Sequence, residues 1–175
     1  PDCVQDFCES TGVDAASPSE IINTYQKQWT DHKCERIAGF GQRFAKIVKD
    51  ALPSAMIGAY MCPWTPQEFD GALTRIFGQD YQLFGEFIDV FTPLIYTTKS
   101  GRPSYWSAEF LEGAVEYVPE GHPVQPILDA LDYPGSLQAL VGASVKSWGF
   151  QLYDGAKLMA NPESAAQFAK LIASL

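Results

Sequence analysis

Four short apolar segments alternate with helix-like segments along the chain, and this alternation limits the fold more than any other feature. The segments are residues 55–62, residues 89–96, a strand within 122–131, and residues 148–154. A strand and the helix that follows it take roughly 30 to 40 residues, which is long enough for a right-handed crossover between parallel strands. Strands that are apolar on both faces also suit a sheet that helices cover. The sequence therefore predicts an α/β fold with a parallel sheet.

The first predicted helix has a clear start. Ser17 is expected to cap it, with Pro18 at the first helical position and Glu20 at the third. Residues 1–17 show no clear period, so they are expected to form an irregular lead-in. A single α/β domain is then expected to cover residues 18–175.

Two further helix starts use the same types of residue. Thr65, Pro66 and Glu68 repeat the order found at the first helix, and Asn161 is expected to cap a final helix that runs to the end of the chain. Apolar residues at helical spacing between 18 and 52 predict one long helix or two joined helices.

Parallel α/β sheets occur as doubly wound sheets and as closed barrels. Nucleotide-binding members of the doubly wound class place a glycine-rich turn, G-x-G-x-x-G or G-x-x-x-x-G-K-[ST], directly after a strand. Neither turn follows any of the predicted strands. A (β/α)8 barrel of the TIM type is therefore the favoured architecture, and the four predicted units correspond to half of one.

The charge balance excludes several classes of partner. The chain carries 12 Lys and Arg against 21 Asp and Glu, which gives a net charge of −9. A negatively charged chain without a Lys- or Arg-rich stripe is not expected to bind nucleic acid or an anionic membrane surface. No apolar run approaches the roughly 20 residues of a membrane-spanning helix.

Aromatic residues make up 13% of the chain, enough to line a pocket for ring-shaped ligands.

Cysteine and histidine residues give little support for a metal site. Cys3 and Cys8 could pair with each other or form half of a metal site, but no second pair stands at zinc-finger spacing. Free structural thiols are the favoured state, and the cysteines leave the cellular location open. His32 and His122 are the only histidines, so a catalytic zinc site is not expected. No Ser or Cys stands in a nucleophile elbow, so a hydrolase triad is not expected either. We expect no metal and no cofactor.

Five stretches, taken in order, resemble the C-terminal half of a group of TIM-barrel glycoside hydrolases. They are WTDHKCERI at 29–37, GAYMCPW at 58–64, IFGQDY at 76–81, DVFTPLIY at 89–96 and GRPSYW at 101–106. The lead-in with Cys3 and Cys8 is similar to a cysteine-rich segment that precedes this helix in those proteins. No single stretch is specific, and the order of all five carries the resemblance.

The resemblance implies a sugar-handling barrel whose first four strands precede residue 1. The chain would then hold strands five to eight, and a partner chain or a second copy of this chain would complete the barrel. The alternative is a non-catalytic sugar-binding or scaffold module. The resembling proteins commonly have His at the position of Thr97 and tend to have Gln at the position of Asp129.

In a barrel of parallel strands, the active site lies at the carboxyl ends of the strands and in the loops that follow them. Sugar rings stack on Tyr and Trp through their apolar C–H faces, while their hydroxyl groups bind carboxylate, amide and cationic side chains. The substrate-binding candidates at these positions are Tyr60, Trp64, Tyr96, Lys99, Arg102, Asp132, Gln151 and Tyr153.

Glycoside cleavage requires two carboxyl groups, one protonated and one ionised. Asp129 ends the third predicted strand and Asp154 ends the fourth, so these two are the candidate catalytic residues. A carboxylate at the end of an apolar strand is costly to bury without a partner, which favours a place in the site for Asp129. The sequence thus predicts a glycoside hydrolase-like domain that acts on or binds carbohydrate, with the sugar and its linkage left open.

Overall fold

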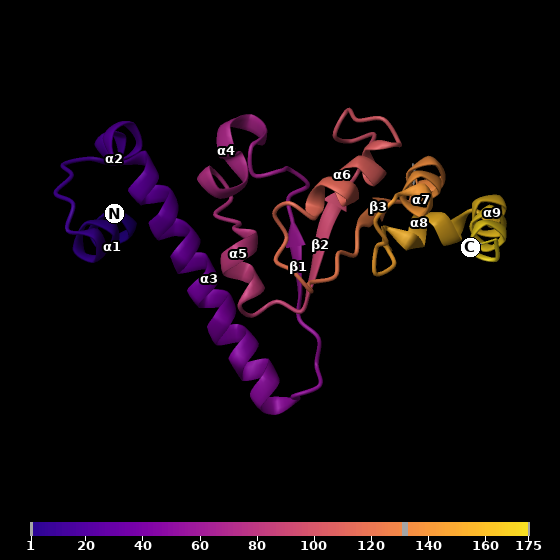
Figure 1. The fold of residues 1–175 in the computed structure, drawn as a ribbon, viewed down its shortest axis with the longest axis horizontal. Helices are drawn as coiled ribbons and strands as arrows, with labels where there is room; N and C mark the ends of the chain where they lie inside the picture. The colour runs from indigo at the N-terminus through magenta and orange to yellow at the C-terminus, as the bar shows by residue number, and fades with distance from the viewer. Residues whose placement is uncertain (1, 131–132, 175) are drawn as a thin grey trace. The chain divides into compact units, whose positions relative to one another are not determined.

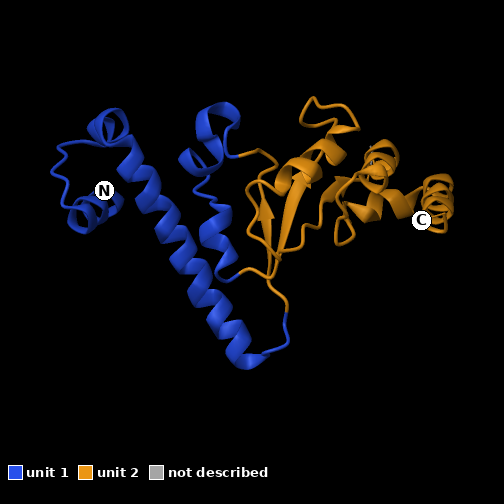
Figure 2. Cartoon of the chain, viewed as in Figure 1, with its two compact units in different colours: residues 1–55, 66–87 blue, residues 56–65, 88–175 orange. Residues whose placement is uncertain are grey.

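The computed structural model describes residues 2–130 and 133–174. The chain forms two compact units (Figure 2). Unit 1 contains residues 1–55 and 66–87, and unit 2 contains residues 56–65 and 88–175. Compactness alone does not separate domains, so the single domain expected over residues 18–175 stays a prediction.

Unit 2 contains a four-stranded parallel sheet, and Figure 1 labels its first three strands. Its strands are β1 (Gly58–Met61), β2 (Val90–Ile95), β3 (Ile127–Asp129) and β4 (Gln151–Tyr153). Each strand lies inside a segment that the sequence predicts as a strand, so the predicted α/β class and parallel sheet are confirmed. The strands pair in the order in which they occur along the chain, and no reversal occurs among the described strands.

Two helices pack together against this sheet. α6 (Trp106–Ala114) follows β2 and α7 (Tyr133–Gly142) follows β3, and the two helices lie side by side. A buried cluster joins them to the sheet through Ile95 of β2 and Leu128 of β3. The helices contribute Phe110, Leu111, Leu137 and Leu140 to this cluster. α8 (Gly155–Ala160) and α9 (Pro162–Ile172) complete the unit.

The sheet has a second face, opposite α6 and α7. Side chains alternate between the two faces of a strand, and Ile95 and Leu128 point toward the helices. Their neighbours Leu94 and Ile127 therefore lie on the second face. The parallel register pairs Ile127 with both Leu94 and Gln151, so one row of side chains crosses three strands there. The next row, at the carboxyl ends of the strands, contains candidate site residues.

Unit 1 is helical, with α1 (Asp2–Thr11), α2 (Pro18–Thr24), α3 (Gln26–Ala51), α4 (Glu68–Arg75) and α5 (Tyr81–Gly85). The Ser17 hydroxyl accepts a hydrogen bond from the Glu20 amide at 3.2 Å, and the Glu20 carboxylate accepts one from the Ala16 amide at 3.0 Å. These contacts confirm Ser17 as the predicted cap. The break between α2 and α3 confirms the alternative of two joined helices.

The lead-in expected to be irregular instead contains α1. Phe7 in this helix is fully buried, and its ring centroid lies 5.5 Å from those of both Trp29 and His32 in α3. A short helix without an obvious apolar period is stabilised mainly by such tertiary contacts. The contacts come from residues far along the chain, so the local sequence does not reveal the helix.

The predicted start of α4 is wrong. The helix begins at Glu68 rather than after a Thr65 cap, and its residues Phe69, Asp70 and Gly71 have positive φ angles. The Arg75 side chain donates hydrogen bonds to the carbonyl oxygens of Phe69 and Asp70, both at 2.9 Å. These bonds stabilise a left-handed turn that a helix-start signal does not encode.

Candidate functional site

Three candidate side chains form one row at the carboxyl end of the sheet. Asp129 of β3 pairs in register with Tyr153 of β4, and Tyr96 directly follows β2. Alternation along the strands puts all three on the second face, one row beyond Ile127. The ring centroids of Tyr96 and Tyr153 lie 5.3 Å apart, and the rings make an angle of 41°.

Lys99 joins this row from the loop after β2. Its ammonium group forms an ion pair with the Asp129 carboxylate. The Nζ atom also lies 4.8 Å from the ring centroid of Tyr96 and 4.9 Å from that of Tyr153. An ammonium group over an aromatic face is attracted by the negative potential of the ring. We call Tyr96, Lys99, Asp129 and Tyr153 the Lys99 cluster.

The Lys99 cluster is buried at its carboxylate and open at its ammonium group. The Asp129 side chain is 6% exposed, whereas the Lys99 side chain is 53% exposed. An ion pair with one half-exposed partner contributes little to stability, because solvent screens the interaction. The cluster therefore presents an ammonium group at the surface above a buried carboxylate.

Tyr60 belongs to the same surroundings. It lies opposite Thr92 in the register of β1 and β2, on the second face, and it is 66% exposed. The pKa of Tyr96 is raised, chiefly by burial, and further by the neighbouring Tyr153, Asp129 and Tyr60. The place of Tyr60 in the register of β1 and β2 extends the candidate surface across to β1.

Asp154 has a lysine partner of its own. It stands at the N-cap position of α8 with φ 61°, and its Oδ2 atom accepts a hydrogen bond from Lys157 Nζ at 2.5 Å. This bond is the main cause of the raised pKa of Lys157, to which Asp129 also contributes. The sequence interpretation missed Lys157. Its spacing of three residues from Asp154 at a helix start is the signal that identifies it.

Four other candidates lie elsewhere or outside the described residues. The Arg102 guanidinium lies over the indole ring at the start of α6, 5.2 Å from its centroid. The Gln151 amide donates a hydrogen bond to the Gln125 side-chain oxygen at 2.7 Å, one row nearer the amino ends of the strands. Trp64 is half-buried in the loop after β1. Asp132 falls outside the described residues.

Thr97, where the resembling proteins commonly have His, has a role in the fold. It is buried, and its Oγ1 atom lies 3.1 Å from the Ser136 hydroxyl of α7. The Ser136 carbonyl oxygen accepts a hydrogen bond from the Ser107 hydroxyl of α6 at 2.7 Å. These contacts join the loop after β2 to both helices.

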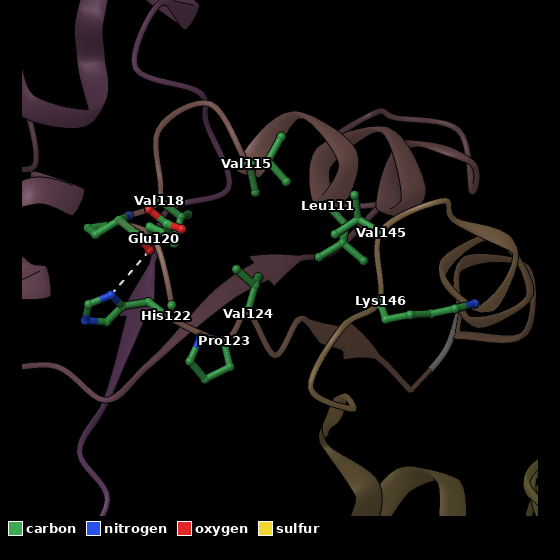
Figure 3. A pocket seen from close by; sticks show the side chains of 12 residues that line it. Leu111, Val115, Val118, Glu120, His122, Pro123, Val124, Val145 and Lys146 are labelled. Carbon is green, nitrogen blue, oxygen red and sulfur yellow. Dashed lines mark hydrogen bonds between the residues drawn. The ribbon is translucent and has the colours of Figure 1, made fainter.

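A hollow of about 440 Å³ lies at the amino ends of the strands, away from the Lys99 cluster (Figure 3). The end of α6 and the loops before β3 and β4 form it, with apolar side chains such as Val115, Val118 and Val145. His122 Nδ1 in its wall lies 3.3 Å from the Pro119 carbonyl oxygen. None of the described candidate residues lines this hollow, so it is separate from the predicted site.

Within residues 2–130 and 133–174, no three His, Cys, Asp or Glu side chains are grouped so that they could hold a metal ion. Among the helices of these same ranges, none has both the length and the apolar character needed to cross a membrane. The chain matches no protein family model, no curated protein sequence and no solved structure.

Proposed function

We propose that unit 2 carries a carbohydrate-binding surface of the glycoside hydrolase type at the carboxyl ends of its strands. The observation that carries the proposal is the grouping of Tyr60, Tyr96 and Tyr153 on one face with Asp129 and Lys99. Sugars bind through aromatic rings that face their C–H groups and through charged groups that bind their hydroxyls. This edge of the sheet offers both within one small area.

The proposal extends to the fold, in which unit 2 corresponds to the C-terminal part of a (β/α)8 barrel. Barrel strands lie side by side in chain order, and the connecting helices pack around the outside. The sequential parallel order of β1 to β4 and the packing of α6 beside α7 support this interpretation. Leu94 and Ile127 on the second face would then line the barrel interior. A partner chain or a second copy would complete the barrel.

The ion pairs favour binding over cleavage. A glycosidase needs one carboxyl group that is protonated while the other is ionised. Asp129 is paired with Lys99, and Asp154 with Lys157. A carboxylate in an ion pair keeps lone pairs that accept hydrogen bonds from sugar hydroxyls, so both candidates suit binding without any rearrangement. Hydrolysis, the second candidate function, requires that substrate displaces one of the lysines.

Calorimetric titration with a panel of soluble oligosaccharides tests the binding function. We expect Tyr153→Ala to weaken binding roughly tenfold, because a stacked aromatic ring contributes about 1 kcal/mol or more. Trp148→Ala is the matched control, since Trp148 is 50% exposed and Tyr153 is 51% exposed, and Trp148 lies in the loop before β4. Equal losses in the two variants, or no binding of any oligosaccharide by the wild type, contradict the proposal.

Aryl glycosides test cleavage separately. We expect any hydrolysis by the wild type to be abolished in Asp129→Asn, because this variant removes the buried carboxylate. Activity that survives the substitution removes Asp129 from the mechanism. Binding without cleavage assigns the chain to the non-catalytic alternative.

A further inference from the structure

We propose that Lys99 occupies a binding site for a primary ammonium group, and that the external occupant of this site is the protonated amine of an amino sugar. The inference rests on the proposed carbohydrate-binding function and specifies the class of sugar. It comes from the Lys99 cluster, where one ammonium group meets two tyrosine rings and one carboxylate.

The Lys99 cluster has the composition of an ammonium-binding cage. The Nζ atom lies 4.8 and 4.9 Å from the two ring centroids, and the rings are 5.3 Å apart, so a single cation contacts both tyrosines. The Asp129 carboxylate supplies the negative charge that neutralises the cation. Aromatic faces of this kind bind the ammonium groups of ligands in other proteins.

The Lys99 side chain can leave the cage without a change in the loop backbone. The amides of Ser100, Gly101 and Arg102 donate hydrogen bonds of 2.8 to 3.1 Å to the carbonyl oxygens of residues 96–98. These bonds fix the loop through its main chain. Because the Lys99 side chain is half-exposed and its four-carbon stem is flexible, it can rotate into solvent. Exchange with a ligand therefore needs a rotation of the Lys99 side chain and leaves these backbone bonds in place.

The carboxylate selects a primary ammonium group over a quaternary one. A primary ammonium group carries three N–H donors, and Lys99 directs Nζ toward Asp129 Oδ2. A quaternary ammonium group has no N–H donor, so it could not donate a hydrogen bond to this carboxylate. The protonated amine of an amino sugar reproduces both the charge and the donors of Lys99.

One feature favours an amino sugar over a lysine-containing peptide, and a second favours a polycation of either kind. Tyr60 lies exposed on the same face as the cage and offers a flat apolar surface for a neighbouring sugar ring. The net charge of −9 attracts a polymer with a positive charge on each sugar. A linear, deacetylated amino-sugar polymer satisfies both conditions.

Affinities measured for Lys99→Met test the inference, because this substitution keeps the apolar stem and removes the competing ammonium group. The probes are tetramers of glucosamine, N-acetylglucosamine and glucose with the same linkage, together with tetralysine, at a pH below the pKa of the sugar amine. We expect Lys99→Met to bind the glucosamine tetramer roughly tenfold more tightly than the wild type does, since the site is no longer occupied. The two uncharged tetramers are expected to gain nothing from the substitution, since they carry no ammonium group to take the place of Lys99. Lys46→Met removes another exposed, ion-paired ammonium group and is the matched control.

The outcomes separate the inference from the proposed function. If no sugar tetramer binds either protein, the carbohydrate-binding function fails. If uncharged tetramers bind but the glucosamine tetramer gains nothing in Lys99→Met, the function stands and the ammonium site is refuted. An equal gain for every sugar tetramer means that Lys99 only obstructs the surface, and this too overturns the inference. An equal gain for tetralysine refutes the amino sugar as the occupant.

Lys99→Gln keeps the test decisive if Lys99→Met does not fold. The glutamine amide still donates to Asp129, so the buried carboxylate keeps a partner while the positive charge is lost. We expect a smaller gain for the glucosamine tetramer, roughly threefold, in a variant whose circular dichroism matches the wild type. Asp129→Asn is expected to abolish the preference for the glucosamine tetramer over the glucose tetramer. A preference that survives in Asp129→Asn contradicts the role of the carboxylate.

Discussion

The phenol of Tyr96 lies where its charged form is disfavoured. Burial has the largest effect, and Tyr153, Asp129 and Tyr60 add to it, so the pKa of Tyr96 is raised. The folded protein therefore keeps this proton at a pH where the unfolded chain has released it. It follows that the free energy of unfolding decreases as the pH rises from the ordinary tyrosine value of about 10 through the pKa of folded Tyr96.

Asp129→Asn is expected to lower the pKa of Tyr96 toward its ordinary value, because the substitution removes a negative neighbour. Carbon NMR of ring-labelled tyrosine during an alkaline titration resolves Tyr96 from the other tyrosines. Tyr25 in unit 1 is the internal reference. A pKa of Tyr96 that stays the same or increases in this variant contradicts the electrostatic contact.

Gly78 combines a backbone requirement with a close contact. Its φ is +63°, and a Cβ atom there would lie 2.4 Å from Ile37 Cδ1. We expect Gly78→Ala to lower the free energy of unfolding by about 1 to 3 kcal/mol, as measured by urea unfolding. Gly113→Ala in α6 is the control, since a Cβ atom there meets nothing within 4 Å, and it is expected to keep the free energy of unfolding unchanged or raise it by up to about 1 kcal/mol. Equal losses in the two variants contradict the steric explanation.

Single residues show which parts of the candidate site the sequence can predict. Tyr96, Asp129 and Tyr153 follow from one rule, that the ends of parallel strands meet at one edge of the sheet. The ion pair between Lys99 and Asp129 does not follow from any rule of spacing. A loop lysine finds its partner through the path of the folded chain, and the local sequence does not encode that path.

At the scale of elements, the helix starts also show which features the local sequence predicts and which depend on the folded chain. Asn161 caps α9 as predicted, with its side-chain oxygen accepting bonds from the amide of Glu163 at 3.0 Å and from the next amide at 3.2 Å. Thr65 carries the same kind of signal, yet α4 begins later in the chain. A cap signal lies within about four residues of a helix start. The start of α4 is stabilised instead by the side chain of Arg75, the last residue of that helix.

α3 shows why periodicity alone does not predict burial. Its buried residues are His32, Cys34, Ala38 and Ala45. The large apolar residues at helical spacing are instead exposed, including Phe40, Phe44 and Ile47. Periodicity identifies an apolar face on a helix, but only the tertiary structure determines whether another element covers that face.

Asp80 is the N-cap of α5, and its Oδ1 atom accepts hydrogen bonds from the amides of Gln82 at 2.8 Å and Leu83 at 3.1 Å. We expect Asp80→Ala to lower the free energy of unfolding by about 1 kcal/mol, because two helix amides lose their acceptor. Asp80→Asn keeps an oxygen acceptor, so we expect it to lower the free energy of unfolding by only roughly a few tenths of 1 kcal/mol. Urea unfolding measures both variants. If Asp80→Asn costs as much as Asp80→Ala, the cap is not the source of the stability.

At the scale of the whole molecule, the two units are interleaved along the chain. Residues 56–65, which include β1, belong to unit 2, whereas residues 1–55 and 66–87 belong to unit 1 (Figure 2). The chain passes from one unit to the other at residues 55–56, 65–66 and 87–88. Unit 1 is therefore not one continuous segment, and a scan of composition along the sequence does not reveal it.

The exposed apolar residues of α3 predict association that depends on concentration. Phe40, Phe44 and Ile47 are 67%, 56% and 68% exposed, and apolar surface of this kind promotes contact between molecules. We expect light scattering after size exclusion to give a mass above 19.3 kDa at high concentration, and Phe44→Glu to reduce that mass. Gln28→Glu adds the same charge to α3 and is the control. A wild-type monomer at every concentration contradicts the association and removes the second copy from the barrel proposal.

The sequential order of the strands has a consequence for synthesis on the ribosome. β2 pairs with β1, β3 pairs with β2, and β4 pairs with β3. Each strand therefore emerges after the strand that it joins, and the sheet can extend in the direction of translation with a single growing edge. In a sheet whose order reverses, one edge of an early strand would stay open until a much later strand arrived. The order of β1 to β4 thus shortens the time for which the edge that each strand offers to the next one is open to other chains.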